Sequence, residues 1–264
     1  MPIFLPQQAP VLSGVNTMPN PFFQFKHFTV YHDRCAMKVT TDACLFGAWV
    51  ADNCQESLGN DQPSAVNHQR VLDIGTGTGL LSLMVAQKNS HLHIDAIEID
   101  EQAAAQAAEN VKASPYASAI SVYHHDITAW EKGAYNIILS NPPFYEKEIP
   151  SSLQGKNIAH HGEGLRLETL FKIIKEKLTD TGTFYLLLPY KRRQDIEKLM
   201  QQTGLYIQKL AIVQPTVENA PFRLLLKGSK HPVNTHITSL SVYDAAKQYT
   251  PGFVSLLKEY YLYL

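Results

Sequence analysis

The 264-residue sequence has few cysteines, no long apolar run and no excess of positive charge. Its three cysteines, Cys35, Cys44 and Cys54, are odd in number and lack CxxC spacing. This argues against a disulfide framework and a zinc site, and predicts reduced thiols. No stretch approaches the roughly 20 apolar residues of a membrane-spanning helix, and the first residues do not resemble a signal peptide. We therefore expect a cytoplasmic protein that does not associate with membranes.

The charge balance also limits the kinds of partner. Lysine and arginine total 23 and aspartate and glutamate 24, so the formal net charge is −1. No whole-protein positive field attracts nucleic acid, and any RNA contact must come from a local patch. The candidate phosphate contacts are Lys26, Arg34, Lys38 and the run 191–193. The histidine pairs at 124–125 and 160–161 lack partnering cysteines or HExxH spacing, so we expect no metal site.

The pattern of the chain predicts one domain behind a short leader. Residues 1–21 contain five prolines and are expected to be a disordered leader. Residues 22–264 are expected to form a single domain, which begins with a strand and helix extension at 22–69. The extension is expected to hold a strand at 22–31 and a helix at 40–51, and the tail a helix at 243–264.

The rest of this domain alternates between strands and helices. The expected strands are 71–74, 91–99, 120–124, 135–140, 183–189, 205–213 and 222–226. The expected helices between them are 80–87, 101–113, 167–178 and 192–202. Such alternation predicts a Rossmann-like α/β fold with a mostly parallel, seven-stranded sheet and helices on both faces. Consecutive strands at the end predict an antiparallel C-terminal strand.

A glycine-rich turn, DIGTGTG at 73–79, follows the strand 71–74. Gly75 and Gly77 remove side chains where a cofactor must approach the backbone, and glycine tolerates the positive φ of such a turn. The spacing is GxGxG, whereas dinucleotide folds place a pyrophosphate on a GxGxxG turn. S-adenosylmethionine (SAM) has no phosphate, and the acidic Asp73 beside the turn suits its ammonium group.

Two further carboxylates follow later strands. Glu98 ends the strand 91–99, where its side chain can accept hydrogen bonds from both ribose hydroxyls of the cofactor. Asp126 follows the strand 120–124, where it can accept a hydrogen bond from the adenine amine of the cofactor. Together with Asp73, Gly75 and Gly77, these residues predict a binding site for SAM and no metal.

The sequence Asn141-Pro142-Pro143-Phe144 follows the strand 135–140. The Asn141 side-chain oxygen and the Pro142 carbonyl can each accept one hydrogen of a planar amine, which directs the nitrogen lone pair at a methyl donor. Positioning and electrostatics then supply most of the reduction of the barrier. Phe144 would stack on the extracted base and Tyr145 would extend that surface. These residues also occur in ordinary turns, but this position favours amine methylation.

These motifs carry a family resemblance. The glycine turn, Glu98, Asp126 and the NPPF turn are similar to those of the class I SAM-dependent amino-methyltransferases. The segment 25–42, the AAAQAAENV helix and the tail 249–264 resemble the bacterial tRNA(Val) adenine-N6 methyltransferases, across residues 22–264. The resemblance implies methylation of the adenine just 3′ of the anticodon of a valine tRNA. We expect the protein to be a monomer or a weak homodimer.

The same resemblance assigns roles to the segment before the helix 40–51. It implies that Lys38 and Thr41 belong to the cofactor site, and that Arg34 and Asp42 belong to the substrate mouth, with Phe144 and Tyr145. This chain has Phe144 where relatives often carry tyrosine, and either ring can stack.

Several alternative functions remain open from the residues. Guanine-N2 methyltransferases of rRNA also use NPPF, and a glutamine amide of a protein can be gripped in the same way. The glutamine enzymes usually carry an N-terminal helical domain, whereas the N-terminus here is short and expected to be partly strand-like, which disfavours this function. A SAM- or RNA-binding module without catalysis is disfavoured by the intact NPPF motif. An NAD-dependent dehydrogenase would require GxGxxG.

Overall fold

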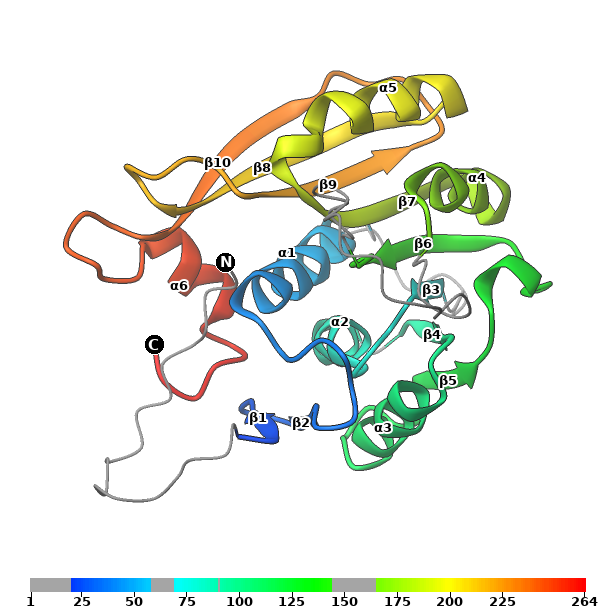
Figure 1. The fold of residues 1–264 in the computed structure, drawn as a ribbon, viewed down its shortest axis with the longest axis horizontal. Coiled ribbons are helices and arrows are strands. Elements are labelled where there is room, and N and C mark those ends of the chain that lie inside the picture. The colour runs from blue at the N-terminus through cyan, green and yellow to red at the C-terminus, as the bar shows by residue number, and fades with distance from the viewer. Residues whose placement is uncertain (1–19, 58–68, 90, 144–164) are drawn as a thin grey trace, which may run out of the picture.

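The computed structural model describes residues 20–57, 69–89, 91–143 and 165–264. The predicted leader, apart from its last two residues, lies outside the described residues. In chain order the elements are β1 (Phe22–Gln24), β2 (Thr29–Tyr31), α1 (Thr41–Ser57), β3 (Arg70–Ile74), α2 (Leu80–Lys88), β4 (His93–Glu98), α3 (Glu101–Lys112), β5 (Ile120–His124), η1 (Ile127–Ala129), β6 (Tyr135–Ser140), α4 (Leu167–Lys177), β7 (Leu178–Pro189), η2 (Tyr190–Arg192), α5 (Arg193–Thr203), β8 (Tyr206–Thr216), β9 (Arg223–Ser229), β10 (His236–Tyr243) and α6 (Pro251–Leu257) (Figure 1).

The main sheet has the strand order β10-β8-β9-β7-β6-β3-β4-β5. Strands β7, β6, β3, β4 and β5 are parallel, whereas β9 runs antiparallel to both β7 and β8. The α/β class, the mostly parallel sheet and the antiparallel strand near the C-terminus are therefore confirmed. The number of strands needs a correction: in the described residues the sheet has eight strands, because β10 pairs in parallel with β8 at one edge.

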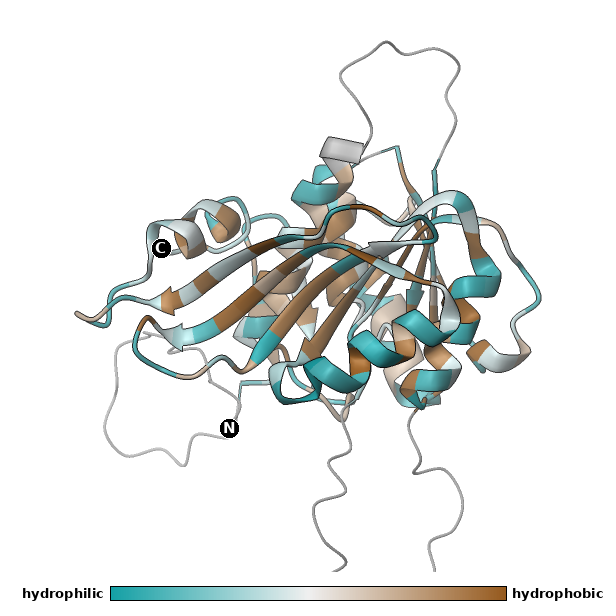
Figure 2. Ribbon diagram, turned by 90° about the horizontal axis from the view of Figure 1, so that it is seen from above, coloured by the Kyte–Doolittle hydropathy of each residue, from teal (hydrophilic) through white to brown (hydrophobic). Residues whose placement is uncertain are grey.

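Helices cover both faces of this sheet (Figures 1 and 2). Helices α1, α2 and α6 bury one apolar face, and α4 and α5 bury the other. The inner strands are apolar along most of their length, as expected for parallel strands buried on both sides. Helix α4 buries residues spaced three and four apart, such as Leu167, Leu170, Phe171 and Ile174, which is the periodicity of one helix face.

The first strand prediction is wrong in one respect. Residues 22–31 form an antiparallel hairpin of β1 and β2, and not one strand. The hairpin contacts the end of the chain, where the Lys26 N–H donates to the Tyr260 carbonyl at 2.8 Å and Phe25 bridges to Tyr261. The tail is helical only in α6, because the residues after it turn back towards this hairpin.

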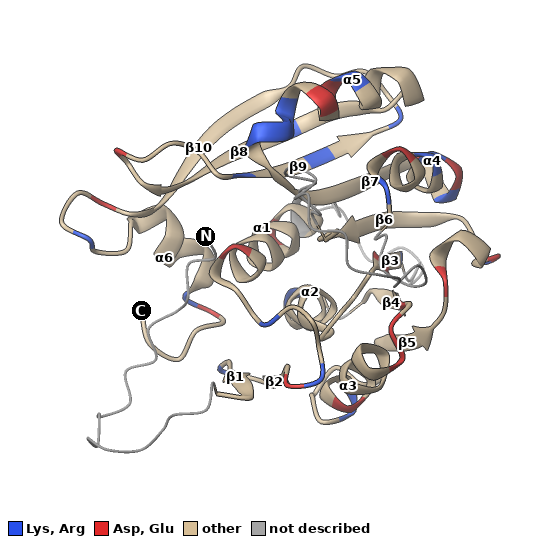
Figure 3. Cartoon of the chain, in the orientation of Figure 1, with Lys and Arg blue, Asp and Glu red and all other residues tan. Residues whose placement is uncertain are grey.

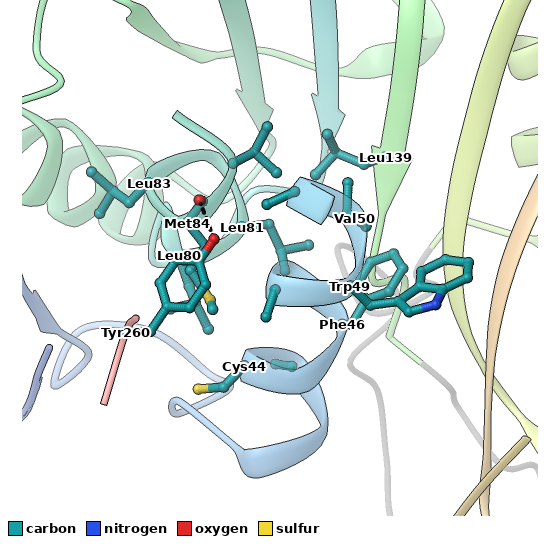
Figure 4. Packing of buried hydrophobic residues seen from close by; sticks show 14 of the residues in the cluster. Cys44, Phe46, Trp49, Val50, Leu80, Leu81, Leu83, Met84, Leu139 and Tyr260 are labelled. Carbon is teal, nitrogen blue, oxygen red and sulfur yellow. Dashed lines mark hydrogen bonds between the residues drawn. The ribbon is translucent and has the colours of Figure 1, made fainter. Parts of the chain in front are cut away.

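Tyr260 connects this tail to the core of the domain. Its side chain is fully buried, and its hydroxyl donates to the Met84 carbonyl of α2 at 2.9 Å (Figure 4). We expect Tyr260→Phe to lower the free energy of unfolding by about 1 kcal/mol, because one buried hydrogen bond is lost while the ring packing remains. Urea denaturation measures the change. The control Tyr263→Phe, at a position 87% exposed, should leave stability unaltered, and an equal loss in both variants would contradict this assignment.

Candidate active site

The ends of three parallel strands bring the predicted site residues to one edge of the sheet. Ile74, the last residue of β3, pairs with Ile97 of β4 and with Ser140 of β6. The Ser140 hydroxyl also donates to the Ile74 carbonyl at 2.8 Å, which fixes the ends of β3 and β6 together. Because neighbouring strands lie about 4.8 Å apart, the glycine turn, Glu98 and Asn141 leave the sheet side by side. We call this the carboxyl edge.

The glycine turn adopts the conformation that its sequence predicts. Gly75 and Gly77 have φ values of 69° and 56°, which disfavour side chains. A Cβ atom added to either glycine would meet no atom of the described residues within 4 Å, so these residues leave the space above both glycines open. The N–H groups of Gly75 and Thr76 both donate to the Ile97 carbonyl, at 2.9 and 3.0 Å, which holds the turn against β4.

The Glu98 side chain connects the glycine turn to the turn between β4 and α3. One carboxylate oxygen accepts the Gly77 N–H at 2.8 Å, and the other accepts the N–H groups of Ile99 and Asp100 at 2.9 and 3.0 Å. A carboxylate offers about four lone-pair sites, so three backbone bonds leave capacity for a ligand hydroxyl. The sequence analysis predicted the binding role of Glu98 but missed its bonds to the backbone of the turn.

Asp73 lies beneath the glycine turn with an exposed fraction of 0%. Its Oδ2 atom accepts the hydroxyls of Thr76 and Ser82, each at 2.7 Å. Its Oδ1 atom is buried and has no hydrogen-bond partner among the described residues. Burial raises the pKa of Asp73 to about 6, against the opposing effect of the two hydroxyls. The sequence did not reveal the roles of Thr76 and Ser82, because single hydroxyl residues carry no distinctive pattern.

The Asn-Pro-Pro turn, Asn141 to Pro143, begins directly after the pinned end of β6. Asn141 is partly exposed, Pro142 is buried and Pro143 is exposed. A buried proline gives the Pro142 carbonyl a constrained position next to Asn141. Phe144 and Tyr145, the predicted stacking residues, lie outside the described residues.

Asp126 lies near the end of β5, on the far side of β4. It is exposed, and its Oδ1 accepts the Thr128 N–H at 2.8 Å as the cap of η1. This bond orients the carboxylate, and its exposure leaves it accessible to a ligand at the carboxyl edge.

The first turn of α1 reaches the same edge. Asp42 forms an ion pair with Arg223, the first residue of β9, with 2.8 Å between Oδ2 and Nε. Lys38 is exposed just before α1, and Thr41 is buried. Arg34 pairs instead with Glu109 of α3, and this hydrogen bond raises the pKa of its guanidinium. The role of Asp42 in the substrate mouth stays a prediction, and its ion pair with Arg223 is not indicated by the sequence.

Two further observations come from the described part of the chain. In residues 20–57, 69–89, 91–143 and 165–264, no group of three or more His, Cys, Asp or Glu side chains is arranged to hold a metal ion. Helices long and apolar enough to cross a membrane are likewise absent from these ranges.

Known structures share this architecture. A predicted O-methyltransferase from Agrobacterium tumefaciens superposes with a TM-score of 0.57 at 16% identity, over 83% of this chain and 96% of that one. A protein from Listeria monocytogenes, solved as a proposed class I S-adenosylmethionine-dependent methyltransferase, gives a TM-score of 0.55 at 12% identity, over 77% of this chain and 67% of that one. The family model of the methyltransferase small domain matches residues 36–210. The chain is a methyltransferase with the class I fold.

Relatives of similar length identify the family within this class of methyltransferases. A protein from Parabacteroides distasonis is 36% identical over 93% of this chain and 99% of its own length. Another, from Klebsiella pneumoniae subsp. pneumoniae, is 36% identical over 94% of this chain and 97% of its own. Both are named tRNA1(Val) (adenine(37)-N6)-methyltransferase. The chain belongs to this family of tRNA methyltransferases.

Proposed function

We propose that this protein transfers a methyl group from SAM to N6 of adenine 37 in a valine tRNA. The observation that carries the proposal is the placement of Asn141 beside the glycine turn, fixed by the hydrogen bond from Ser140 to the Ile74 carbonyl. Near full-length similarity to relatives named for this reaction supports the choice of substrate. The reaction would take place in the cytoplasm.

The residues at the carboxyl edge fit SAM in shape and chemistry. The open space above Gly75 and Gly77 admits a ligand close to the backbone. The remaining capacity of the Glu98 carboxylate suits a ribose hydroxyl, and the exposed Asp126 suits the adenine amine of the cofactor. The Oδ1 atom of Asp73, beneath the turn and without a hydrogen-bond partner among the described residues, suits the ammonium group. When bound, SAM supplies an electrophilic methyl group on a sulfonium.

The protein's own part in the reaction is to orient the target amine. The Asn141 side-chain oxygen and the Pro142 carbonyl would each accept one N6 hydrogen of the substrate adenine. This arrangement draws the nitrogen towards tetrahedral geometry and aims its lone pair away from the two acceptors. No strong base is needed before attack, because such positioning and preorganised dipoles lower the barrier. The N6–methyl bond would form as the bond between methyl and sulfur breaks, which leaves S-adenosylhomocysteine, and the extra proton on N6 would then pass to solvent.

Transfer from radiolabelled SAM into tRNA from cells lacking this protein tests the function. Nucleoside mass spectrometry should find the label in N6-methyladenosine, and mapping should place it at position 37 of the valine tRNA. Label in N2-methylguanosine, or in protein, would overturn the substrate while leaving the reaction class intact.

We expect Glu98→Gln to weaken SAM binding about tenfold or more, because the amide loses charge and one acceptor oxygen at the glycine turn. Calorimetric titration with SAM measures the affinity. Glu197→Gln, which alters an exposed ion pair with Arg193 on α5, is the control and should bind SAM normally. Equal affinity of Glu98→Gln and wild type would contradict the ribose assignment.

A further inference from the structure

On one side of the Asn-Pro-Pro turn, strand β7 extends beyond the end of β6. Ser140 at the end of β6 pairs with Leu186, but β7 continues for three residues to Pro189, which pairs with Arg223. At about 3.3 Å per residue, this pairing lies about 10 Å beyond the end of β6. Strand β8 continues alongside, since Val213 also pairs with Arg223. The projecting ends of β7, β8 and β9 form a wall near Asn141.

Phe222 stands on this wall in a fixed backbone setting. Its N–H donates to the Val213 carbonyl at 2.9 Å, and its own carbonyl accepts the Tyr190 N–H at 3.1 Å. The side chain is partly exposed and packs against the α1-side core. The guanidinium carbon of Arg223 lies 5.4 Å from the ring centroid. The ring therefore packs against the core on one side and lies beside the Arg223 guanidinium on another.

Arg223 is fixed in turn by α1. Its ion pair with Asp42 joins two side chains that are 28% and 15% exposed. The pair ties the first turn of α1 to the wall beside Phe222. By contrast, two basic residues at the start of α5 form ion pairs with acidic residues of that helix: Arg192, the last residue of η2, pairs with Asp195, and Arg193 pairs with Glu197 (Figure 3). The Phe222–Arg223 pair thus combines an aromatic face and a cation at a defined place next to the site.

We infer that Phe222 binds the base of a nucleotide adjacent to the target adenine by stacking, with Arg223 and Asp42 as positioning residues. The inference rests on the proposed function. A base whose amine lies at Asn141 extends away from the sheet, so its sugar and neighbouring nucleotides reach the level of the wall. Unpaired bases of RNA loops stack on aromatic rings and on arginine planes. Such a contact is worth about 1–3 kcal/mol per base.

A double-mutant cycle between protein and RNA tests this contact. The substrates are intact valine tRNA and two tRNAs with an abasic sugar on the 5′ or the 3′ side of the target adenine. The proteins are wild type, Phe222→Leu, Phe222→Tyr and Tyr206→Leu. Tyr206 is an exposed aromatic residue at the opposite end of β8, so it is the matched control. The readouts are kcat/KM for each tRNA and the Kd of SAM.

We expect wild type to lose about tenfold in kcat/KM on one of the two abasic tRNAs. Phe222→Leu should lose about tenfold on intact tRNA and nothing further on that abasic tRNA, because the same contact is already gone. Phe222→Tyr and Tyr206→Leu should match wild type, and SAM affinity should be unaltered in all variants.

Three results would overturn the inference. If the loss in kcat/KM from Phe222→Leu adds to the loss from the abasic sugar, the ring and the base do not share a contact. Undiminished transfer to both abasic tRNAs by the wild-type protein would also overturn the inference. This test needs no variant, so it decides the question even if Phe222→Leu fails to fold. Absence of transfer by wild type to intact tRNA would overturn the proposed function, and the inference with it.

Discussion

Replacing Asn141 with alanine should lower kcat for methyl transfer by about 10³-fold or more, while the Kd of SAM stays within a few-fold of wild type. The side-chain oxygen accepts an amine hydrogen, and removal of one preorganised polar group at a reacting centre typically costs about 10²–10³ in rate. Loss of the fixed direction of the lone pair adds to this cost. Single-turnover transfer to valine tRNA measures the rate, and calorimetry measures SAM affinity.

The matched control is Asn234→Ala, in the exposed loop between β9 and β10. It should retain the wild-type rate, since its side chain lies outside the carboxyl edge. A rate for Asn141→Ala within tenfold of wild type would refute the amine-gripping mechanism. A parallel collapse of SAM affinity would instead mean that Asn141 serves mainly the cofactor.

Replacing Asp73 with asparagine should weaken SAM binding by about 10- to 100-fold, because a charged hydrogen bond to the ammonium group is worth about 1.5–3 kcal/mol. The ionised form makes this bond, and the pKa of Asp73 in the free protein is about 6. Wild-type affinity for SAM should therefore fall as the pH drops below 6. Asp73→Asn should bind weakly with little dependence on pH, as calorimetry between pH 5 and pH 8 will show.

The same carboxylate should affect stability in the opposite sense. Its pKa is raised from 3.8 to about 6 on folding. Its contribution to the free energy of unfolding is thus fully present below pH 3.8 and is lost as the pH rises through 6. The shift corresponds to at most roughly 3 kcal/mol. Asp73→Asn should remove this pH dependence, so that denaturant curves of variant and wild type diverge between pH 4 and pH 7.5.

Asp180→Asn, at a side chain 82% exposed, is the control for both measurements. Normal SAM binding by Asp73→Asn would contradict the ammonium assignment. A stability difference that stays constant from pH 4 to pH 7.5 would contradict the raised pKa.

The sequence predicted the elements whose residues have a strong local pattern. The apolar strands β3 and β6 and the turns that follow them stand out, since buried parallel strands are continuously hydrophobic. The sequence does not predict the edge strand β10, because half of its side chains are exposed and the hydrophobic signal is weak. It predicts one strand in place of the β1–β2 hairpin, because the turn at Phe25 to Phe28 contains no glycine, proline or asparagine.

The candidate site shows the same division. The positions of Asp73, Glu98 and Asn141 at the carboxyl edge could be predicted because each lies near or directly after the end of a recognisable strand. The burial of Asp73 and the pairing of Asp42 with Arg223 could not, since they depend on contacts between residues far apart in the sequence. Arg223 lies 181 positions from Asp42, and no local pattern marks such a partner. The proposed roles of Phe144 and Tyr145 stay predictions.

The contact between the N-terminal hairpin and the chain's last residues has a consequence for synthesis. Tyr260 and Tyr261 fill buried positions against α2, Phe25 and Phe253, so these surfaces stay open until both tyrosines have been synthesised. Domains generally fold as units during synthesis, and exposed apolar surface invites aggregation. A chain that is cut short before Tyr260 would therefore carry its finished glycine turn on an incompletely covered core, and would be a good target for chaperones and proteases.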